Sequence, residues 1–361
     1  MTVPQGGKAI IINETGGSDK LVYTESRPVP KPGPGQILVK NDYAGVNFID
    51  TYFRGGLYPL ASFPHVLGQE GLGSVVEANG NDLGFKEGDR VVWMAGGSYA
   101  EYTAVPAART IKVPAGLDEQ HVLGGFLMGM TALSLIQEAY PVKKGDKVLL
   151  HAAAGAMGLL LSQLLRSLGA YTIGTAGSPE RCQLAKEAGA NEVIDYNANP
   201  GGEWVKKVLG LTGGEGVDVV YDSVGKTTWE GSLEAVKRKG KGMLSPCYLP
   251  APVRTKSDFT NMNVFVFVLL LVVYWGNSSG PVPPINLTRL APKSLSIQRS
   301  TLMAYIVTRA EFETYANKAF DLLKSGALNV KVHKVYDLKD AKQAHDDLEG
   351  RKTSGKLLLK I

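Results

Sequence analysis

Short apolar runs separated by glycine and proline fill the first third of the chain. They fall at residues 9–12, 36–43, 71–77, 89–93 and 99–105. Runs of this length that are bounded by turn-forming residues are typical of β-strands. The first third therefore predicts an all-β domain.

After Pro114, longer helical stretches alternate with continuous apolar runs. This alternation indicates parallel strands joined by helices, and so an α/β domain with a doubly wound sheet. We expect it to begin with a helix over 117–140 and strands over 147–152 and 171–175. The remaining expected elements are strands at 192–195 and 217–222, a helix at 311–325, a strand at 330–336, a helix at 338–348 and a strand at 355–359.

One segment does not fit this pattern. Proline recurs in the first part of residues 244–263, and residues 264–275 are an unbroken apolar run. The run is too short for a membrane helix, which needs about 20 residues. The segment is either a looped-out hairpin, whose closure entropy grows slowly with length, or a stretch that does not belong to the folded protein. The aggregation hazard of an exposed apolar run favours the second account.

Composition and charge narrow the class of protein. The 361 residues suggest about two domains. The net charge of +5 is spread along the chain rather than gathered in one basic block, which disfavours nucleic-acid binding. The only cysteines, Cys182 and Cys247, fit a reducing compartment, and the N-terminus has no secretory pattern. A cytoplasmic location and no membrane partner are expected.

The run HAAAGAMG at residues 151–158 follows one predicted strand and opens a predicted helix. Ala153, Gly155 and Gly158 occupy the three small-residue positions of a dinucleotide-binding turn. Gly155 would let the backbone approach a pyrophosphate, Gly158 would let the helix pack closely on the sheet, and the helix N-terminus offers free N–H groups. The context predicts a dinucleotide site, with a plain tight turn as the alternative.

The residues after the second strand distinguish NADH from NADPH. An NAD site places Asp or Glu about 20 residues beyond the turn. Here residues 175–178 read Thr-Ala-Gly-Ser, and Arg181 follows. A 2′-phosphate would meet hydroxyl, backbone N–H and guanidinium groups without an opposing carboxylate, so NADPH is predicted. Ser178 also suits a helix N-cap before Pro179, and both roles can coexist.

Five motifs together resemble one family. They are VNFIDTYFRGGLYP at 46–59, HAAAGAMG at 151–158, VYDSVG at 220–225, GNSSGPV at 276–282 and LEGRKTSGKLLL at 348–359. On these motifs the chain resembles the zinc-independent, ζ-crystallin-like quinone oxidoreductases of the medium-chain dehydrogenase/reductase superfamily. The resemblance covers nearly the whole chain.

The resemblance implies a GroES-like β domain, residues 1–125 and 300–361, clasping a Rossmann NADPH-binding domain, residues 126–299, usually in a homodimer. Relatives run directly from the strand after the basic turn into the glycine motif. Here about 30 residues lie between Met243 and Gly276. We therefore expect an atypical insertion at about 244–275, which leaves open whether the chain as written is active.

The resemblance also implies a set of site residues. Asn47, Asp50 and Tyr52 would line the nicotinamide and quinone pocket as the catalytic group, and Tyr52 or a water molecule would supply a proton. Tyr52 packing only between domains, and Asp50 only capping a helix, are the alternatives. The implied cofactor-binding residues are Ser134, Gly155, Ala156, Met157, Gly158, Ser178, Arg181, Tyr196, Ser223, Gly276, Asn277, Ser278 and Arg351.

No zinc is expected, because a zinc site needs three or four suitable ligands. Gln69 stands where a histidine ligand would be placed. The implied activity is NADPH-dependent reduction of quinones, by hydride or single electrons. Reduction of α,β-unsaturated carbonyls is the alternative activity. An AU-rich RNA-binding or crystallin-like structural role is an alternative that the scattered charge does not favour. The histidines, which show no ligand spacing, are His65, His121, His151, His333 and His345.

Overall fold

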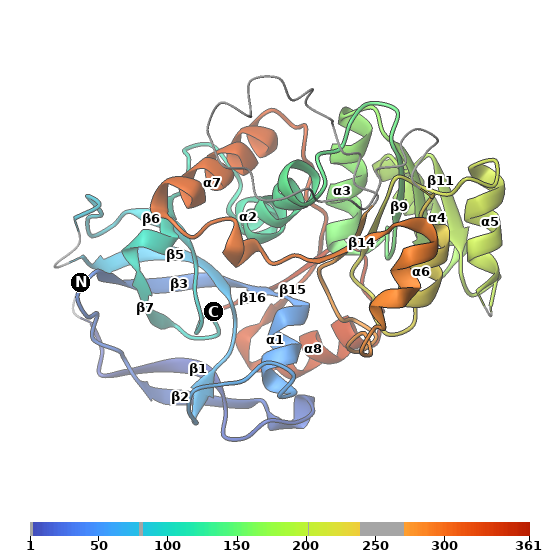
Figure 1. Ribbon diagram of the computed structural model, residues 1–361. Coiled ribbons are helices and arrows are strands. Elements are labelled where there is room, and N and C mark those ends of the chain that lie inside the picture. The colour runs from blue at the N-terminus through green and yellow to red at the C-terminus, as the bar shows by residue number, and fades with distance from the viewer. Residues whose placement is uncertain (1–2, 79–81, 201, 239–270) are drawn as a thin grey trace, which may run out of the picture.

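The computed structural model describes residues 3–78, 82–200, 202–238 and 271–361. It has a predominantly β domain next to a domain with a parallel sheet, and the chain returns to the first domain at its C-terminal end (Figure 1). This arrangement is the α/β fold class predicted, with a GroES-like part and a Rossmann part.

The parallel sheet has six strands in the order β11-β10-β9-β12-β13-β14. The order reverses between β9 and β12, as in a Rossmann sheet, and such a switch point opens a crevice at the carboxyl ends of the strands. The strands are β9 (Lys147–Leu150), β10 (Tyr171–Ala176), β11 (Glu192–Asp195), β12 (Val219–Asp222), β13 (Leu271–Tyr274) and β14 (Ser296–Arg299).

Helices cover both faces of this sheet because successive strand residues are apolar and point to opposite sides. Val148 and Leu150 pack in one core with α3, whereas Leu149 packs in another with α5 and α6. The helices are α3 (Ala156–Ser167), α4 (Pro179–Ala188), α5 (Glu203–Leu211) and α6 (Trp229–Ala235).

Strand β13 corrects the expected extent of the insertion. Residues 271–274, the end of the apolar run, pair in parallel with β12 on one side and β14 on the other. Leu271 and Val273 enter one core and Val272 and Tyr274 the other. The prediction that the atypical segment extends to about 275 is therefore wrong at its end, since a strand buried on both faces belongs to the sheet. The rest of that segment lies outside the described residues.

Val273→Ala is expected to lower the free energy of unfolding by about 2 kcal/mol, because it removes fully buried methyl groups and leaves a cavity. Chemical denaturation measures the change. The matched control is Val307→Ala, since the Val307 side chain is 67% exposed. Equal, small effects of the two substitutions would contradict the placement of residues 271–274 in the sheet.

The β domain contains a seven-stranded sheet in which β16 pairs with β3 and β3 pairs with β5 and β7. A second sheet has the order β2-β1-β4. The strands of the domain are β1 (Gly6–Ile12), β2 (Val22–Pro28), β3 (Gln36–Val46), β4 (His65–Val66), β5 (Glu70–Glu77), β6 (Arg90–Met94), β7 (Tyr102–Pro106), β8 (Thr110–Lys112), β15 (Val332–Asp337) and β16 (Lys356–Lys360).

The expectation of an all-β first third was wrong at one place. The helix α1 (Phe48–Arg54) follows β3 directly, and the carboxylate of Asp50 accepts a hydrogen bond from the N–H of Asn47 at 2.8 Å. This contact satisfies a free N–H at the helix N-terminus. The sequence Phe-Ile-Asp-Thr-Tyr carries β-forming residues, so its local propensity did not indicate the helix.

Helix α2 (Glu119–Ser134) continues in a π-helical turn, Leu135–Ala139, and joins the two domains. Its side chains Phe126 and Met130 pack in the core of the β domain, and Ala132 packs in the core under the parallel sheet. The proposed domain boundary after residue 125 falls inside this helix and stays a prediction. The helices of the C-terminal segment are α7 (Arg309–Lys324) and α8 (Ala341–Glu349).

The segment Glu119–Ala139 has the length and apolar composition of a membrane span, but 78% of its most apolar window is buried inside the protein. Core helices of globular domains meet the same criterion. We therefore interpret this helix as a core element that the two domains share.

Candidate active site

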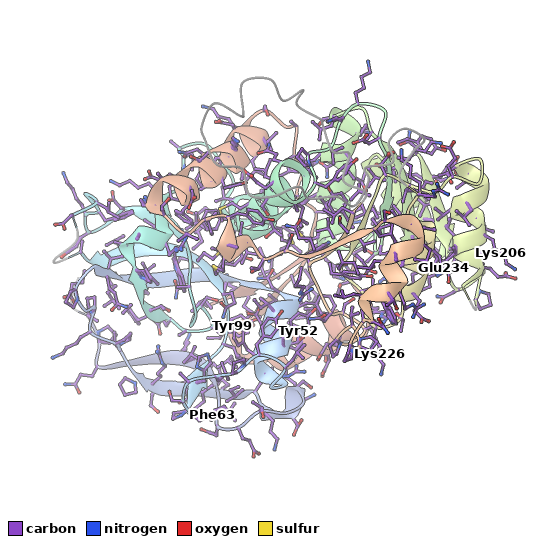
Figure 2. All side chains as sticks on the ribbon, viewed as in Figure 1. Tyr52, Phe63, Tyr99, Lys206, Lys226 and Glu234 are labelled. Atoms are coloured by element: carbon purple, nitrogen blue, oxygen red, sulfur yellow. The ribbon has the colours of Figure 1, made fainter. Side chains whose placement is uncertain are left out.

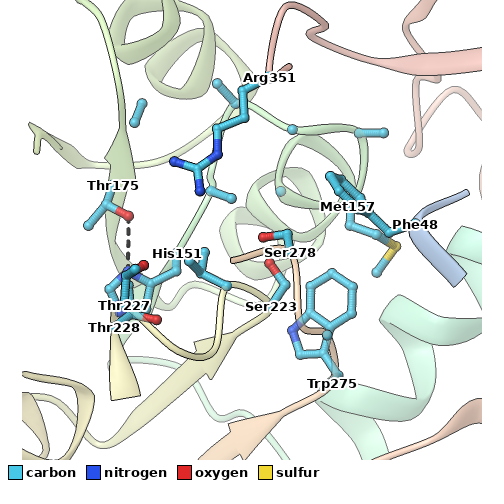
Figure 3. A pocket seen from close by; sticks show the side chains of 18 of the residues that line it. Phe48, His151, Met157, Thr175, Ser223, Thr227, Thr228, Trp275, Ser278 and Arg351 are labelled. Atoms are coloured by element: carbon cyan, nitrogen blue, oxygen red, sulfur yellow. Dashed lines mark hydrogen bonds between the residues drawn. The ribbon is translucent and has the colours of Figure 1, made fainter. Parts of the chain in front are cut away.

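A cavity of about 1190 Å³ lies at the carboxyl ends of the parallel strands and is lined from both domains. Figure 3 shows part of its lining, with Met157 and Phe48 on one side and Thr175 and His151 on another. The predicted site residues that line it are Asn47, Tyr52, Ser134, Gly155, Ala156, Met157, Gly158, Arg181, Tyr196, Ser223, Gly276, Ser278 and Arg351. Those that do not are Asp50, Ser178 and Asn277.

The turn between β9 and α3 has the geometry expected of a phosphate-binding loop. Gly155 is the N-cap of α3 and makes no side-chain cap, so the first N–H groups of the helix stay available to a ligand. A Cβ on Gly158 would lie 2.3 Å from the Ala152 carbonyl oxygen. Glycine is therefore required there for the helix to approach the strand.

The loop after β10 is held against the C-terminal tail. The Arg181 guanidinium donates to the backbone oxygens of Arg351 and Thr353. In Figure 3 the Arg351 guanidinium points toward the middle of the pocket, between Thr175 and Ser278. Two cationic residues from distant parts of the sequence, Arg181 and Arg351, thus line the same cavity, where they would stabilise an anion.

Ser178 and Tyr196 support this loop in different ways. The Ser178 hydroxyl accepts from the Arg181 N–H at 3.3 Å and caps α4, as the alternative interpretation of Ser178 predicted. The Tyr196 hydroxyl lies over Gly177, where an added Cβ would be 2.6 Å away from it. Ser178 is therefore a cap in this structure, whereas Tyr196 lines the cavity.

The loops after β12 and β13 close the other end. Asp222 is fully buried, and its Oδ1 accepts from the N–H groups of Val224 and Gly225 at 2.8 and 3.0 Å. A Cβ on Gly276 would lie 2.7 Å from the Ser223 carbonyl oxygen, so the two loops pack closely. Ser134 also lines the cavity, and its hydroxyl donates to the Thr131 carbonyl at 2.8 Å.

Tyr52, on α1, lines the cavity and contacts the loop after β13 in the other domain; Figure 2 marks its position. Its hydroxyl oxygen accepts from the backbone N–H of Asn277 at 2.8 Å. Burial raises the pKa of Tyr52 to about 12, so the hydroxyl is protonated at neutral pH. Because the Asn277 N–H is the donor of this contact, the Tyr52 proton is left for another acceptor. Tyr52 thus bridges the domains and also offers a proton.

Lys356 and Glu70 form a buried ion pair at the cavity that the sequence analysis missed. Their Nζ and Oε1 atoms are 2.5 Å apart, and the side chains are 2% and 0% exposed. Asn47 joins the pair, since its Oδ1 accepts from Lys356 at 2.7 Å and its Nδ2 donates to Glu70 at 2.9 Å. The pair therefore fixes which way the Asn47 amide faces. Lys356 stands in the C-terminal motif at 348–359, and Glu70 directly follows Gln69 in the sequence.

Asp50 lies behind this group rather than on the cavity surface. Its Oδ2 accepts from Asn47 and, at 3.0 Å, from the Tyr99 hydroxyl, while Oδ1 has no hydrogen-bond partner. Burial raises the pKa of Asp50 to about 7. The contacts of Asp50 position the start of α1, and hence Asn47 and Tyr52.

Within the described residues, no group of three or more His, Cys, Asp or Glu side chains is arranged to hold a metal ion. Cys247 lies outside those residues. The absence of zinc from the site stays a prediction.

Both domains that line this cavity have counterparts in known proteins. Residues 33–115 match the alcohol dehydrogenase GroES-like domain, and residues 156–260 match the zinc-binding dehydrogenase domain. A quinone oxidoreductase of Pseudomonas aeruginosa is 36% identical over 95% of this chain and 96% of its own length. The chain belongs to the quinone oxidoreductase family. That family is part of the medium-chain dehydrogenase/reductase superfamily whose two domains are seen here.

Further relatives extend the comparison. Quinone oxidoreductase 1 of Escherichia coli is 38% identical over 97% of this chain and 98% of its own length. The solved structure of the Escherichia coli enzyme complexed with NADPH superposes with a TM-score of 0.85 at 36% identity, covering 98% of this chain and all of that one. A 2-haloacrylate reductase of Burkholderia is 35% identical over 97% of this chain and 98% of its own length.

Proposed function

We propose that this protein is an NADPH-dependent quinone reductase that works without zinc. The observation that carries the proposal is the single cavity that joins the glycine turn of α3, the cations Arg181 and Arg351, and the Tyr52 hydroxyl. A dinucleotide would lie along the strand ends with its phosphates at α3. Membership of the quinone oxidoreductase family supports the same substrate class.

The residues of the chain have a limited chemical task in this proposal. NADPH supplies the hydride, and the protein holds donor and acceptor in position and excludes water. Asn47, oriented by Lys356 and Glu70, lines the cavity and would help to hold the substrate. Tyr52 holds its proton for the oxygen that becomes negative during reduction. The family resemblance supports three further parts of the proposal. They are the set of site residues given in the sequence analysis, a homodimer and a cytoplasmic location.

Reduction of α,β-unsaturated carbonyl compounds is the second candidate. The similarity to a 2-haloacrylate reductase favours it, because that relative matches nearly the full chain. Transfer of a hydride to such a substrate uses the same cavity and cofactor, so the two activities differ only in the acceptor.

The first experiment follows NADPH consumption by absorbance with 1,2-naphthoquinone and an enone side by side, and repeats both with NADH. We expect quinone-dependent loss of NADPH well above that of NADH. Faster turnover of the enone would favour the second candidate. No turnover of either acceptor by folded protein would contradict the proposed function.

Arg181→Ala is expected to weaken NADPH binding roughly tenfold and to leave NADH binding nearly unchanged, because only NADPH carries the 2′-phosphate that the guanidinium would contact. Fluorescence titration of the two cofactors measures the effect. Arg166→Ala serves as the matched control, since Arg166 lies in the last turn of α3 and is not among the residues that line the cavity. Equal losses for both cofactors would place Arg181 away from the phosphate.

Tyr52→Phe is expected to lower turnover by about tenfold or less. The reduced quinone is acidic enough to need no strong general acid, and the loss would come from the missing proton and from the Asn277 N–H left without its partner. Steady-state kinetics with 1,2-naphthoquinone measures the effect, and Tyr23→Phe, on β2 and not among the residues that line the cavity, is the control. A thousandfold loss would instead identify Tyr52 as an obligatory acid.

A further inference from the structure

Four buried side chains form a hydrogen-bonded row beneath the cofactor end of the cavity. The Ser232 hydroxyl donates to Asp222 Oδ2 at 2.8 Å. His151 Nε2 lies 3.1 Å from Ser232 Oγ, and His151 Nδ1 lies 3.0 Å from Thr175 Oγ1. Figure 3 shows the last contact as a dashed line. The row connects the carboxyl ends of β12, β9 and β10.

Every hydrogen bond in this row is donated toward Asp222. Asp222 accepts hydrogen bonds from two backbone N–H groups at Oδ1, and Oδ2 accepts from Ser232, so the carboxylate is an acceptor throughout. The Ser232 proton is thereby used, and Ser232 Oγ is left to accept from His151 Nε2–H. A neutral imidazole with its proton on Nε2 has a bare Nδ1, which accepts from the Thr175 hydroxyl.

The surroundings of His151 favour the neutral ring. The side chain is 2% exposed, and the Trp204 ring stands edge to face against it with centroids 4.9 Å apart. Burial lowers the pKa of His151, with the Asp222 charge acting in the opposite direction. At neutral pH the imidazole therefore carries a single proton.

The hydrogen bonds of the row determine what the Thr175 hydroxyl, at the carboxyl end of β10, can offer to a ligand. Its hydroxyl proton is committed to His151, so Oγ1 has only lone pairs left for a ligand in the cavity that it lines. In a Rossmann domain the end of this strand faces the adenosine ribose. An NAD enzyme places a carboxylate there to accept from ribose hydroxyls, but a carboxylate would repel a neighbouring 2′-phosphate.

We propose that the buried row Asp222–Ser232–His151 fixes Thr175 as a neutral hydrogen-bond acceptor for the 3′-hydroxyl of the adenosine ribose. The inference rests on the proposed use of NADPH. His151 and Ser232 are positioning residues, because they act on the ligand through Thr175. The arrangement gives the ribose the acceptor it needs and leaves the adjacent phosphate to Arg181 and Arg351.

Calorimetric titration with adenosine 2′,5′-bisphosphate and with its 3′-deoxy analogue tests the ribose contact. The intact protein should bind the deoxy compound about three- to tenfold more weakly, which is the loss of one neutral hydrogen bond. Thr175→Val should bind both compounds equally and weakly, and Thr175→Ser should restore the difference. Equal binding of the two compounds by the intact protein would overturn the inference.

The ring of His151 gives a second readout that packing alone would not change. In protein labelled with ¹⁵N-histidine, the His151 resonances, assigned by their loss in His151→Gln, should show the proton on Nε2. Ser232→Ala should shift this proton distribution and weaken the preference for the 3′-hydroxyl. A proton on Nδ1 in the intact protein would overturn the inference even if Thr175→Val were to bind poorly.

These outcomes separate the inference from the proposed function. NADPH-dependent quinone reduction with no discrimination of the 3′-hydroxyl overturns the inference and leaves the function standing. Failure of the intact protein to bind the bisphosphate or to oxidise NADPH overturns the proposed function and this inference with it.

Discussion

Lys356→Met is expected to lower the free energy of unfolding by about 3–5 kcal/mol, because it leaves the Glu70 carboxylate buried without its cation. The Lys356 and Glu70 side chains are almost inaccessible to water, so solvent cannot replace the lost ammonium. Asn47 also loses a hydrogen bond, and activity should fall with stability. Chemical denaturation and quinone turnover measure the two effects.

The double variant Lys356→Met/Glu70→Gln separates charge from packing. A neutral amide at position 70 can still accept from the Leu127 N–H, which Glu70 Oε2 does at 3.2 Å. We expect the double variant to recover most of the lost stability, since no unpaired charge is then buried. A double variant less stable than Lys356→Met would show that the ion pair is not what the single substitution disrupts.

Gly158→Ala is expected to lower the free energy of unfolding by about 3 kcal/mol and to abolish measurable NADPH binding. The added Cβ would lie 2.3 Å from the Ala152 carbonyl oxygen and 2.6 Å from the Ala153 Cα, both backbone atoms. Relief of that overlap moves the N-terminus of α3 away from the strand, at the place where the phosphates would be held.

Gly155→Ala is the matched control in the same turn. Its Cβ would lie 3.2 Å from the Ala152 oxygen, and Gly155 has a negative φ of −74°, so the unliganded fold should tolerate it. Its stability should change by about 1 kcal/mol or less. If both substitutions destabilise the protein equally, close packing of α3 on β9 is not the reason for glycine at position 158.

Much of the fold was predictable because its patterns are local. The alternation of apolar runs and helices predicted β9, β10, β11 and β12, and the glycine turn predicted the phosphate-binding end of the cavity. Strand β13 was misjudged because a run that is apolar on both faces looks the same in a central parallel strand and in an insertion.

The site was harder to predict than the fold. Asn47, Glu70 and Lys356 come from three distant parts of the sequence, and no spacing rule joins them. Asp50 was expected in the pocket, whereas its hydrogen bonds to Asn47 and Tyr99 place it behind the lining. Thr175 was considered as a donor to phosphate, and no sequence pattern indicated that its Oγ1 lies 3.0 Å from His151 Nδ1.

The pairing of β16 with β3 also has a consequence for synthesis on the ribosome. Lys356 and Asn47 are separated by 309 positions in the chain, a distance that takes roughly 15 to 60 seconds to translate. During that interval residues 43–46 of β3 lack β16, their partner strand on one side, and Glu70 lacks its counter-ion. The parallel-sheet domain is encoded before the tail and can form first. A nascent chain should therefore have the glycine turn of α3 in place before it has a complete pocket, and the unpaired β3 edge is where a chaperone or another nascent chain would attach.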